Sequence, residues 1–522
     1  MSEKLNVSKQ KNIIWILCDS VRVYSTDEDE RGRLQAMDEF AIDAIDFRTA
    51  VTAAPSTIMS VSSMLTGVAP PYLSRDYAGF KGHQEAFESF PQMLRDNGYA
   101  TYALLFLPDA RIFLEPIFGD TCKEIMGGDS VQDEFSNDVM LEKFDLFLES
   151  DRVNDPFFVW LHLNCRGDPD LTSKVSDLLS KLKEFGLYDD SVIILNSDHG
   201  YPDPSRGISY YDKRKYGHDL IMSDDNILAP QLLKIPGVSP QRVDAPISTF
   251  DLFPTIFDYL GIPVSNSVQN FGMTGRSLRA HLEGRRAWDS RLHRTDTRFI
   301  FQPNAAISIR NNQYKYIFYE SDLTEEFFDI VNDPFESNNL ILDETLLDIS
   351  EQYRSEFYRQ QKDIISYHAS ILGPKFKNIV GLSASFILIG DFNQNFITTY
   401  NEIFEVTSVE FNKNKLKEIT ILEHNATKKP DYVIAFPCSK DPFVNTTIFK
   451  TSQRLHKIHN GSRMFVVNYN LDIIDSPRHW LMRLFEKPRQ YYLIFKRDPK
   501  GAIFTVYIDF GRLFKKFKNL LK

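Results

Sequence analysis

Cysteine is scarce in this sequence of 522 residues. It has four cysteines, Cys18, Cys122, Cys165 and Cys438, spread over more than 400 positions. This spacing excludes a disulfide framework and the close pairs of a structural zinc site. We therefore expect reduced thiols and a cytoplasmic protein.

Long apolar runs and an excess of positive charge are also missing. The polar N-terminal segment is followed by IIWILC (residues 13–18), which is too short for a signal peptide core or a membrane span. We expect this run to be a buried strand. The formal net charge of -11 gives no overall reason to expect a nucleic-acid partner.

Apolar, β-branched runs alternate with amphipathic stretches in the first part of the chain. The runs cover residues 12–18, 99–106, 157–163 and 191–196, and a helical pattern covers 34–45. Such runs are typical of strands buried on both faces, so they predict an α/β fold with a mostly parallel sheet flanked by helices. Ligands bind at the carboxyl ends of such strands. Asp19 and the pair Asp198 and His199 follow two of these runs, where chemistry is expected.

The pattern changes twice toward the C-terminus. Short strand-like segments predict a small antiparallel subdomain at about 300–345, which completes a first domain of residues 1–368. Further strand-like runs separated by helical spacers predict an additional α/β, Rossmann-like domain over residues 369–522. The single glycine in ASFILIG is far from a dinucleotide fingerprint, so no nucleotide cofactor is expected.

The last twelve residues, GRLFKKFKNLLK (511–522), predict a basic amphipathic helix. Its leucines and phenylalanines share one face, and its lysines lie mostly elsewhere. Such a helix can lie in an anionic membrane interface, or it can dock on its own domain with solvated lysines. The first interpretation predicts a cytoplasmic protein in peripheral contact with a membrane, where it would reach lipid-linked glycans.

The segment AAPSTIMSVSSMLTG (residues 53–67) resembles the nucleophile segment of the sulfatase-like branch of the alkaline phosphatase superfamily. NIIWILCDSVR, NSDHG, GHDLIMSDDNILAPQLLKIPG and QYKYIFYESDLTEEFFDIVNDPFESNNL resemble further blocks of that family, in the family's order. The resemblance covers about residues 10–345. It implies an alkaline-phosphatase-like central sheet.

The resemblance also implies roles for individual residues. Asp19, Asp198 and His199 correspond to metal ligands, and Thr57 corresponds to the nucleophile whose oxygen completes the metal site. A hydroxyl is a poor nucleophile unless a cation or a base lowers its pKa. Ser56 is the alternative nucleophile. His218 matches a position that contacts the substrate or the leaving group, although a histidine there can also be purely structural.

Several residues depart from the family pattern. Sulfatases form formylglycine from Cys or Ser in a C/S-x-P-x-R context, but these positions hold Thr57, Met59 and Val61, so no formylglycine is expected. Ser20 replaces a second aspartate, which predicts a single divalent metal ion (Zn, Mn, Ca or Mg). Gly167 replaces a histidine, and His162 or Arg166 is expected to bind the substrate in its place.

Relatives with a threonine at the position of Thr57 form a covalent phospho-threonine. This resemblance favours transfer or hydrolysis of phosphate-type esters. The expected substrate is a phosphate ester or a glycan, such as a cell-surface polysaccharide or a lipid-linked glycan. Two alternatives remain: a sulfatase, which hydrolyses sulfate esters, and a catalytically degenerate scaffold that binds a partner.

Overall fold

The chain divides into two compact units, residues 1–368 and 369–522. The computed structural model describes the side chains of a part of the first unit and, in the second, the backbone of the strands alone. The described residues of the first unit are 10–24, 32–72, 88–105, 117–118, 124–126, 137–165, 168–203, 218, 221–264, 275–297, 306–319, 324–357 and 359–360.

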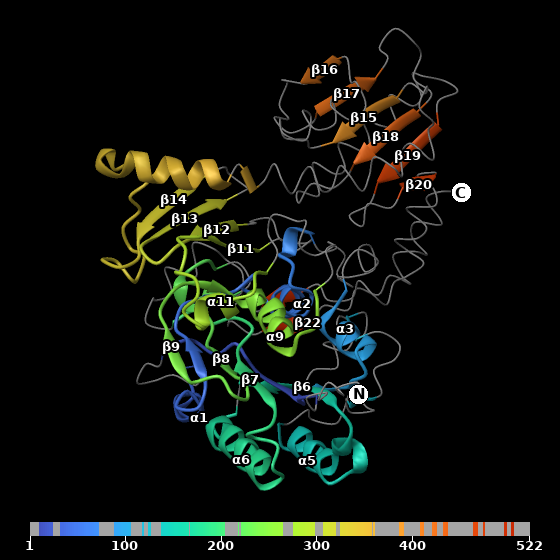
Figure 1. Ribbon diagram of the computed structural model, residues 1–522. Helices are drawn as coiled ribbons and strands as arrows, with labels where there is room; N and C mark the ends of the chain where they lie inside the picture. The colour runs from blue at the N-terminus through green and yellow to red at the C-terminus, as the bar shows by residue number, and fades with distance from the viewer. Residues whose placement is uncertain are drawn as a thin grey trace, which may run out of the picture. The chain divides into compact units, whose positions relative to one another are not determined.

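An eight-stranded sheet forms the centre of the first unit, and Figure 1 labels its strands β6, β7, β8 and β9. The strand order is β5-β4-β6-β1-β7-β8-β2-β9. Strands β5, β4, β6, β1 and β7 pair in parallel, and β8 runs antiparallel to both β7 and β2. The strands are β1 (Ile13–Asp19), β2 (Ile45–Phe47), β4 (Ala100–Leu105), β5 (Glu124–Met126), β6 (Phe157–Asn164), β7 (Val192–Asn196), β8 (Gln231–Lys234) and β9 (Gln241–Val243).

Strand β1 is buried on both faces because successive side chains point to opposite sides of a strand. Ile14 and Ile16 belong to one apolar cluster with residues of α1 (Gln35–Phe40), α5 (Asn137–Leu148) and α6 (Leu171–Glu184). Trp15 points the other way, and its ring contacts Phe90 edge-on at 5.3 Å. Burying an isoleucine side chain such as that of Ile14 or Ile16 contributes about 1.5–3 kcal/mol to the free energy of folding.

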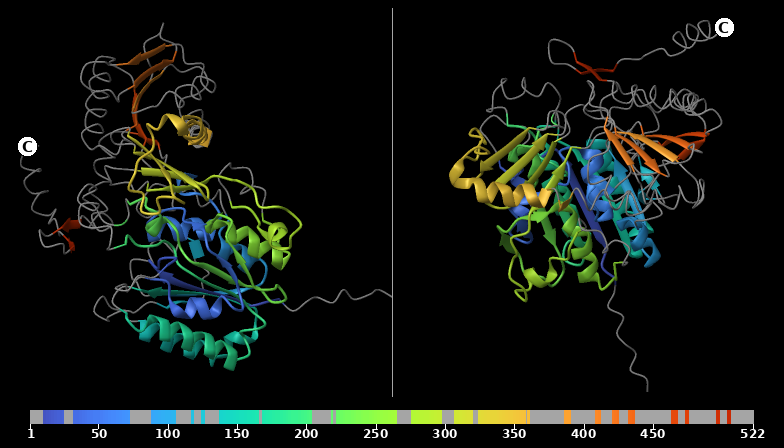
Figure 2. Two further views of the ribbon diagram at one scale, coloured as in Figure 1. Left: turned by 90° about the vertical axis from the view of Figure 1, so that its left-hand side faces the viewer. Right: turned by 90° about the horizontal axis from the view of Figure 1, so that it is seen from above.

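Helices α1, α5 and α6 form one helical layer, which covers one face of the sheet. The second layer, on the other face, consists of α2 (Thr57–Thr66), α3 (Phe90–Asp96) and α9 (Leu252–Leu260). Phe90 of α3 also contacts Phe257 of α9, with 4.9 Å between the ring centroids. Gly67 ends α2 in the left-handed conformation, with a φ of 67°. A Cβ atom there would lie 2.6 Å from the Phe253 ring. Figure 2 shows the sheet between the two helical layers.

A four-stranded antiparallel subdomain completes the first unit. Its strands β11 (His293–Asp296), β12 (Ala306–Arg310), β13 (Tyr314–Tyr319) and β14 (Glu325–Asp329) pair in sequence order. A helix over residues 347–357 packs on it through Tyr353 and Phe357. The backbone N–H of Asp296 donates to the carbonyl oxygen of Ala53 at 3.0 Å, so β11 contacts the loop that leads into α2.

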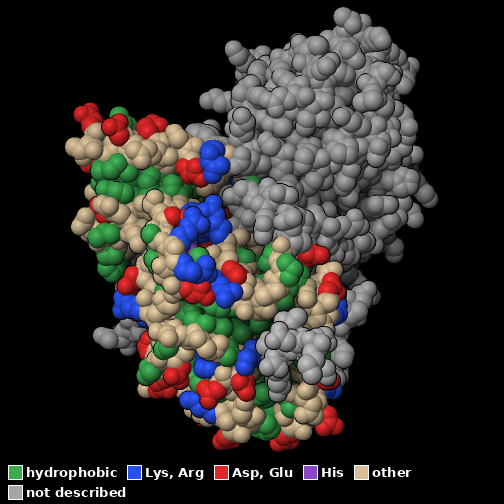
Figure 3. Space-filling view, viewed as in Figure 1, with side chains coloured by type: hydrophobic (Ala, Val, Ile, Leu, Met, Phe, Trp, Pro, Cys, Tyr) green, Lys and Arg blue, Asp and Glu red, His purple; other side chains and the backbone are tan. Residues whose placement is uncertain are grey.

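The surface of the first unit carries both signs of charge. Figure 3 shows Lys and Arg side chains beside Asp and Glu, among apolar and neutral ones. Arg279 on α11 (Arg279–Leu282) forms ion pairs with Asp258 and Glu283. Among the described residues, no helix has the length and apolar character needed to cross a bilayer.

The second unit contains a six-stranded mixed sheet of order β16-β17-β15-β18-β19-β20 and a β21-β22 pair. Its strands are β15 (Phe386–Gly390), β16 (Ser408–Phe411), β17 (Thr420–His424), β18 (Tyr432–Phe436), β19 (Arg463–Val467), β20 (Ile473–Asp475), β21 (Phe495–Arg497) and β22 (Ile503–Thr505). The predicted amphipathic helix at 511–522 lies outside the described residues. The α/β fold class is confirmed for the first unit, where helices flank a mostly parallel sheet.

Candidate active site

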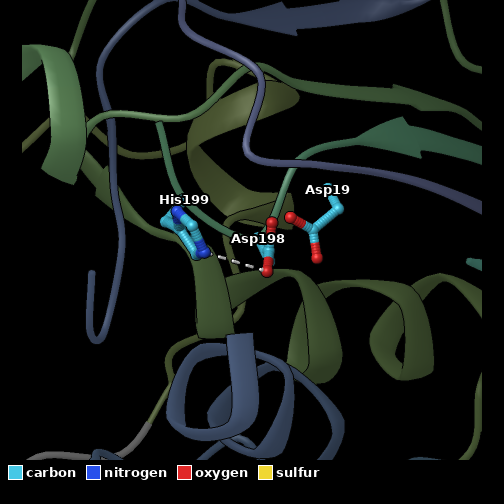
Figure 4. Close-up of side chains that lie close together, drawn as sticks. All are labelled: Asp19, Asp198 and His199. Atoms are coloured by element: carbon cyan, nitrogen blue, oxygen red, sulfur yellow. Dashed lines mark ion pairs between the residues drawn. The ribbon is translucent and has the colours of Figure 1, made fainter. Parts of the chain in front are cut away.

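The carboxyl ends of β1 and β7 bring three metal-ligand side chains together. Asp19 is the last residue of β1, and Asp198 and His199 follow β7, which pairs with β1 in parallel. One ligand atom from each of the three lies within 4.8 Å of the others (Figure 4). The close approach that we expected from the strand ends is therefore present in the structure.

Asp198 is held by the turn that follows β1. The backbone N–H of Ser20 donates to Asp198 Oδ1 at 3.0 Å. Ser20 adopts a φ of 62°, a left-handed conformation that is uncommon for serine. The N–H of Val21 donates to Ser197 Oγ at 2.9 Å, which fixes the two strand ends together. Asp198 Oδ2 is buried and accepts no hydrogen bond from the described residues. A buried carboxylate oxygen of this kind fits a cation ligand.

One hydrogen bond decides the tautomer of His199. Its Nδ1 lies 2.7 Å from the carbonyl oxygen of Gly200, which can only accept, so Nδ1 carries the proton. In a neutral ring Nε2 then presents its lone pair, as a metal-ligating histidine requires. Nε2 lies 3.4 Å from Asp198 Oδ2.

Thr57 is the first residue of α2 and points at this group. Its Oγ1 lies 3.2 Å from Asp19 Oδ2 and 3.3 Å from His199 Nε2. The N-terminus of a helix also favours negative charge on nearby groups. Ser60, one turn later, donates from Oγ to the carbonyl oxygen of Asp198 at 2.6 Å. Thr57 is thus the hydroxyl that contacts Asp19 and His199, and no such contact is found for Ser56 in the described part.

His162 lies behind Asp19. Its Nε2 is 3.2 Å from Asp19 Oδ2, and its buried ring packs edge-on against Trp160 at 6.2 Å. Burial opposes ionisation of Asp19, but the hydrogen bond with His162 and the electrostatic effect of His162 and His199 outweigh it and hold the pKa of Asp19 well below its usual range. This contact gives His162 a role in orienting Asp19. Substrate binding by His162 remains a prediction.

The other predicted site residues have different outcomes. The ring of His218 stacks on that of His199, with 4.9 Å between centroids and 25° between planes. His218 therefore lies beside the predicted metal ligands, and its contact with the substrate or the leaving group remains a prediction. Arg166 and Gly167 lie outside the described residues. Val61, where sulfatases have arginine, is buried within α2.

Sequence reasoning missed Ser60 and Ser197, which hold the Asp198 turn. Ser60 lies three residues after Thr57, so helical spacing places both hydroxyls on one face and was an available signal. Ser197 directly precedes Asp198. Its Oγ donates to the carbonyl oxygen of His199 at 2.8 Å. No periodic pattern marks that bond.

The donor atoms fit one divalent cation. Asp19 Oδ2, Asp198 Oδ2, His199 Nε2 and Thr57 Oγ1 form a mixed oxygen and nitrogen set of the kind that hard or borderline dications take. Ligands bind at the carboxyl edge of a mostly parallel α/β sheet, so this set of side chains forms a candidate metal site at the expected place.

Comparisons with family models show to which family of α/β proteins the chain belongs. The family model described as "Sulfatase" matches residues 11–165, and the one described as "N-sulphoglucosamine sulphohydrolase, C-terminal" matches residues 207–363. The chain is a sulfatase-like member of the alkaline phosphatase superfamily. The predicted resemblance is thereby confirmed.

Similar proteins carry sulfatase names. The chain is 24% identical to an ulvan-active sulfatase of Formosa agariphila over 204 residues, 35% of this chain and 38% of that protein. It is 27% identical to the choline-sulfatase of Rhizobium meliloti over 170 residues, 33% of this chain and 31% of that protein. The alignments thus span less than two-fifths of these relatives.

Solved structures share the fold. BT1596, a 2-O GAG sulfatase, has a TM-score of 0.52 at 15% identity, covering 67% of this chain and 92% of that one. The phosphonate monoester hydrolase SpPMH of Silicibacter pomeroyi has a TM-score of 0.50 at 17% identity, covering 68% and 96%. Together, the family and the curated relatives support the sulfatase alternative better than the phosphate-type transfer that we expected first.

Proposed function

We propose that this chain is a metal-dependent hydrolase of anionic esters, with sulfate esters as the first substrate class. The observation that carries the proposal is the position of Thr57 Oγ1, 3.2 Å from Asp19 Oδ2 and 3.3 Å from His199 Nε2. A hydroxyl within a group of cation ligands is placed to attack an ester whose negative charge the cation neutralises.

The residues divide the chemistry as follows. Thr57 Oγ1 attacks the sulfur or phosphorus atom, and its proton passes to the Asp19 carboxylate, whose Oδ2 lies 3.2 Å away. The bond from the central atom to the alcohol oxygen breaks, and His218 protonates that oxygen. Water then attacks the same sulfur or phosphorus atom and gives a proton to His218. The bond to Thr57 Oγ1 breaks, and the proton held by Asp19 returns to the Thr57 oxygen. A bound dication would be held by Asp19, Asp198 and His199 and would lower the pKa of the hydroxyl.

Phosphate-type esters are the second candidate class, because of Thr57 itself. Formylglycine forms from Cys or Ser in the family, and threonine cannot supply it. An unmodified hydroxyl must leave as an alkoxide when water cleaves the intermediate, as in relatives that form phospho-threonine. The family match and the sulfatase names of the relatives favour sulfate esters, whereas the nucleophile favours phosphate-type esters.

The deciding experiment compares the two classes on one leaving group. Purified full-length protein, with a divalent metal added, is assayed on p-nitrophenyl sulfate, p-nitrophenyl phosphate and bis-p-nitrophenyl phosphate. We expect the highest kcat/KM on the sulfate, and loss of activity in EDTA and in Asp198→Asn. Asp258→Asn, at a partly exposed ion pair, serves as the control. A higher kcat/KM on the phosphodiester would show that phosphate-type esters, not sulfate esters, are the preferred substrates. If no ester is turned over, the catalytically degenerate scaffold is the better explanation.

The alcohol component that we propose is a glycan, as the name of the ulvan-active relative suggests. We further propose that residues 511–522 contact anionic membranes. Their basic, amphipathic pattern supports this, since each lysine near an anionic surface contributes roughly 1 kcal/mol. Co-sedimentation with anionic vesicles at low and high salt, with and without these residues, tests it. Equal sedimentation of the full-length and truncated chains would contradict it.

A further inference from the structure

One asparagine touches the backbone beside both histidines of the site. Asn226 is fully buried and belongs to α8 (Asp224–Ile227). Its carbonyl oxygen accepts a hydrogen bond at 3.0 Å from the N–H of Gly200, the residue after His199. Its side-chain Nδ2 donates to the carbonyl oxygens of His218 and Ile221, both at 2.7 Å. Asn226 therefore connects the two segments that carry the stacked rings.

We propose that Asn226 is a positioning residue that keeps the imidazole of His218 stacked on that of His199. Both amide hydrogens of Asn226 face carbonyl oxygens, so only this side-chain orientation is favourable, because the flipped amide would set three oxygens together. The N–H of Ile221 also donates to the His218 carbonyl oxygen at 3.0 Å. Asn226 thus contacts both residues of that hydrogen bond.

A cluster of buried charged side chains fixes the position of α8. Asp224 contacts Lys315 Nζ at 2.9 Å through Oδ1 and Arg310 Nη1 at 2.5 Å through Oδ2. Glu336 contacts Lys315 Nζ at 2.6 Å and accepts the backbone N–H of Asp224 at 2.8 Å. A helix of four residues is not stable by itself. The antiparallel subdomain therefore supplies the charges that fix Asn226.

The space around Gly200 makes the connection rigid. A Cβ atom on Gly200 would lie 2.1 Å from the carbonyl oxygen of Asp225 and 2.8 Å from that of Leu228. The backbone after His199 thus lies directly against α8, with no room for a side chain between them. A displacement of Asn226 would be transmitted to both histidines.

The test measures the ring of His218 directly. Full-length protein with labelled histidine is saturated with Mg²⁺ and examined by NMR, and the His218 signal is assigned by its loss in His218→Gln. In Asn226→Asp, which replaces the donor with an oxygen, we expect the ring-current shift of His218 to be lost. Asn226→Ser keeps one donor and should give an intermediate shift. Asn97→Leu, which removes an amide bond to the Met93 carbonyl on α3, should leave the signal unchanged.

The kinetic arm rests on the proposed function. With the ester that the wild type cleaves best, Asn226→Asp should lower kcat by about 10- to 100-fold, as expected for a misplaced catalytic group, and change KM much less. If the wild type cleaves no ester, the proposed function fails, while the NMR shift still decides the role of Asn226.

Three results would overturn the proposal. The first is an unchanged His218 signal in a folded Asn226→Asp protein. The second is an equal change in Asn97→Leu. The third is unfolding of both Asn226 variants, since Asn226 would then act as a general folding determinant rather than as a positioning residue.

Discussion

The hydroxyl oxygen of Thr57 lies 3.3 Å from Nε2 of His199, which is the ring nitrogen without a proton in the neutral tautomer. The tautomer follows from the bond of the opposite nitrogen to the Gly200 carbonyl oxygen. The helix start and the turn after β7 thus bring a hydroxyl and a free lone pair together.

Thr57→Ala should lower kcat/KM by at least about 1000-fold, as expected when a nucleophile is removed. Thr57→Ser keeps a hydroxyl and should retain activity within about 10-fold. Ser56→Ala is the matched control, because Ser56 contacts neither Asp19 nor His199 in the described part. Steady-state kinetics on the best ester checks all three. Full activity in Thr57→Ala would remove this residue from the mechanism.

Gly200→Ala should weaken metal binding. Its Cβ would lie 2.1 Å from the backbone oxygen of Asp225, so the turn that carries Asp198 and His199 must shift. Gly186→Ala is the control: Gly186 has a φ of 67° and open space, so its substitution should cost roughly 1–2 kcal/mol without touching the site. Isothermal titration with the activating metal measures both. Equal metal affinities in the two variants would contradict this prediction.

Lys315→Met should lower the free energy of unfolding by about 3–5 kcal/mol, because it removes the buried cation that Asp224 and Glu336 share and leaves Asp224 with Arg310 alone. Lys11→Met removes an exposed pair with Asp190 and should cost less than about 1 kcal/mol. Urea denaturation at neutral pH compares the two variants. Similar losses in the free energy of unfolding in both variants would show that the buried Lys315 pairs stabilise the fold no more than an exposed ion pair does.

His293 should make stability depend on pH. Burial, together with Arg291 and Arg310, lowers its pKa well below the ordinary value. The unfolded chain therefore binds a proton below about pH 6.5 that the folded chain does not, and stability falls with decreasing pH by up to about 1.4 kcal/mol per unit. His293→Gln should reduce this slope. Urea denaturation from pH 5 to pH 7.5 measures the slopes. A wild-type slope in His293→Gln would contradict the assignment.

The sequence by itself determined the sheet and the place of the site. Apolar runs such as residues 13–18 specify strands buried on both faces, and parallel strands end at a common edge. Asp19 and the pair Asp198 and His199 are therefore placed at the same edge of the sheet, and the structure adds that β1 and β7 are neighbours.

Only the tertiary structure decided how these groups are held. His162 lies behind Asp19, Asn226 joins the segments of the two histidines, and Lys315 holds α8 from about 90 residues away. Such contacts join residues that are distant in sequence, and one polar side chain leaves no periodic signal. Burial removes water as a hydrogen-bond partner, so each of these groups must find its partner within the folded chain.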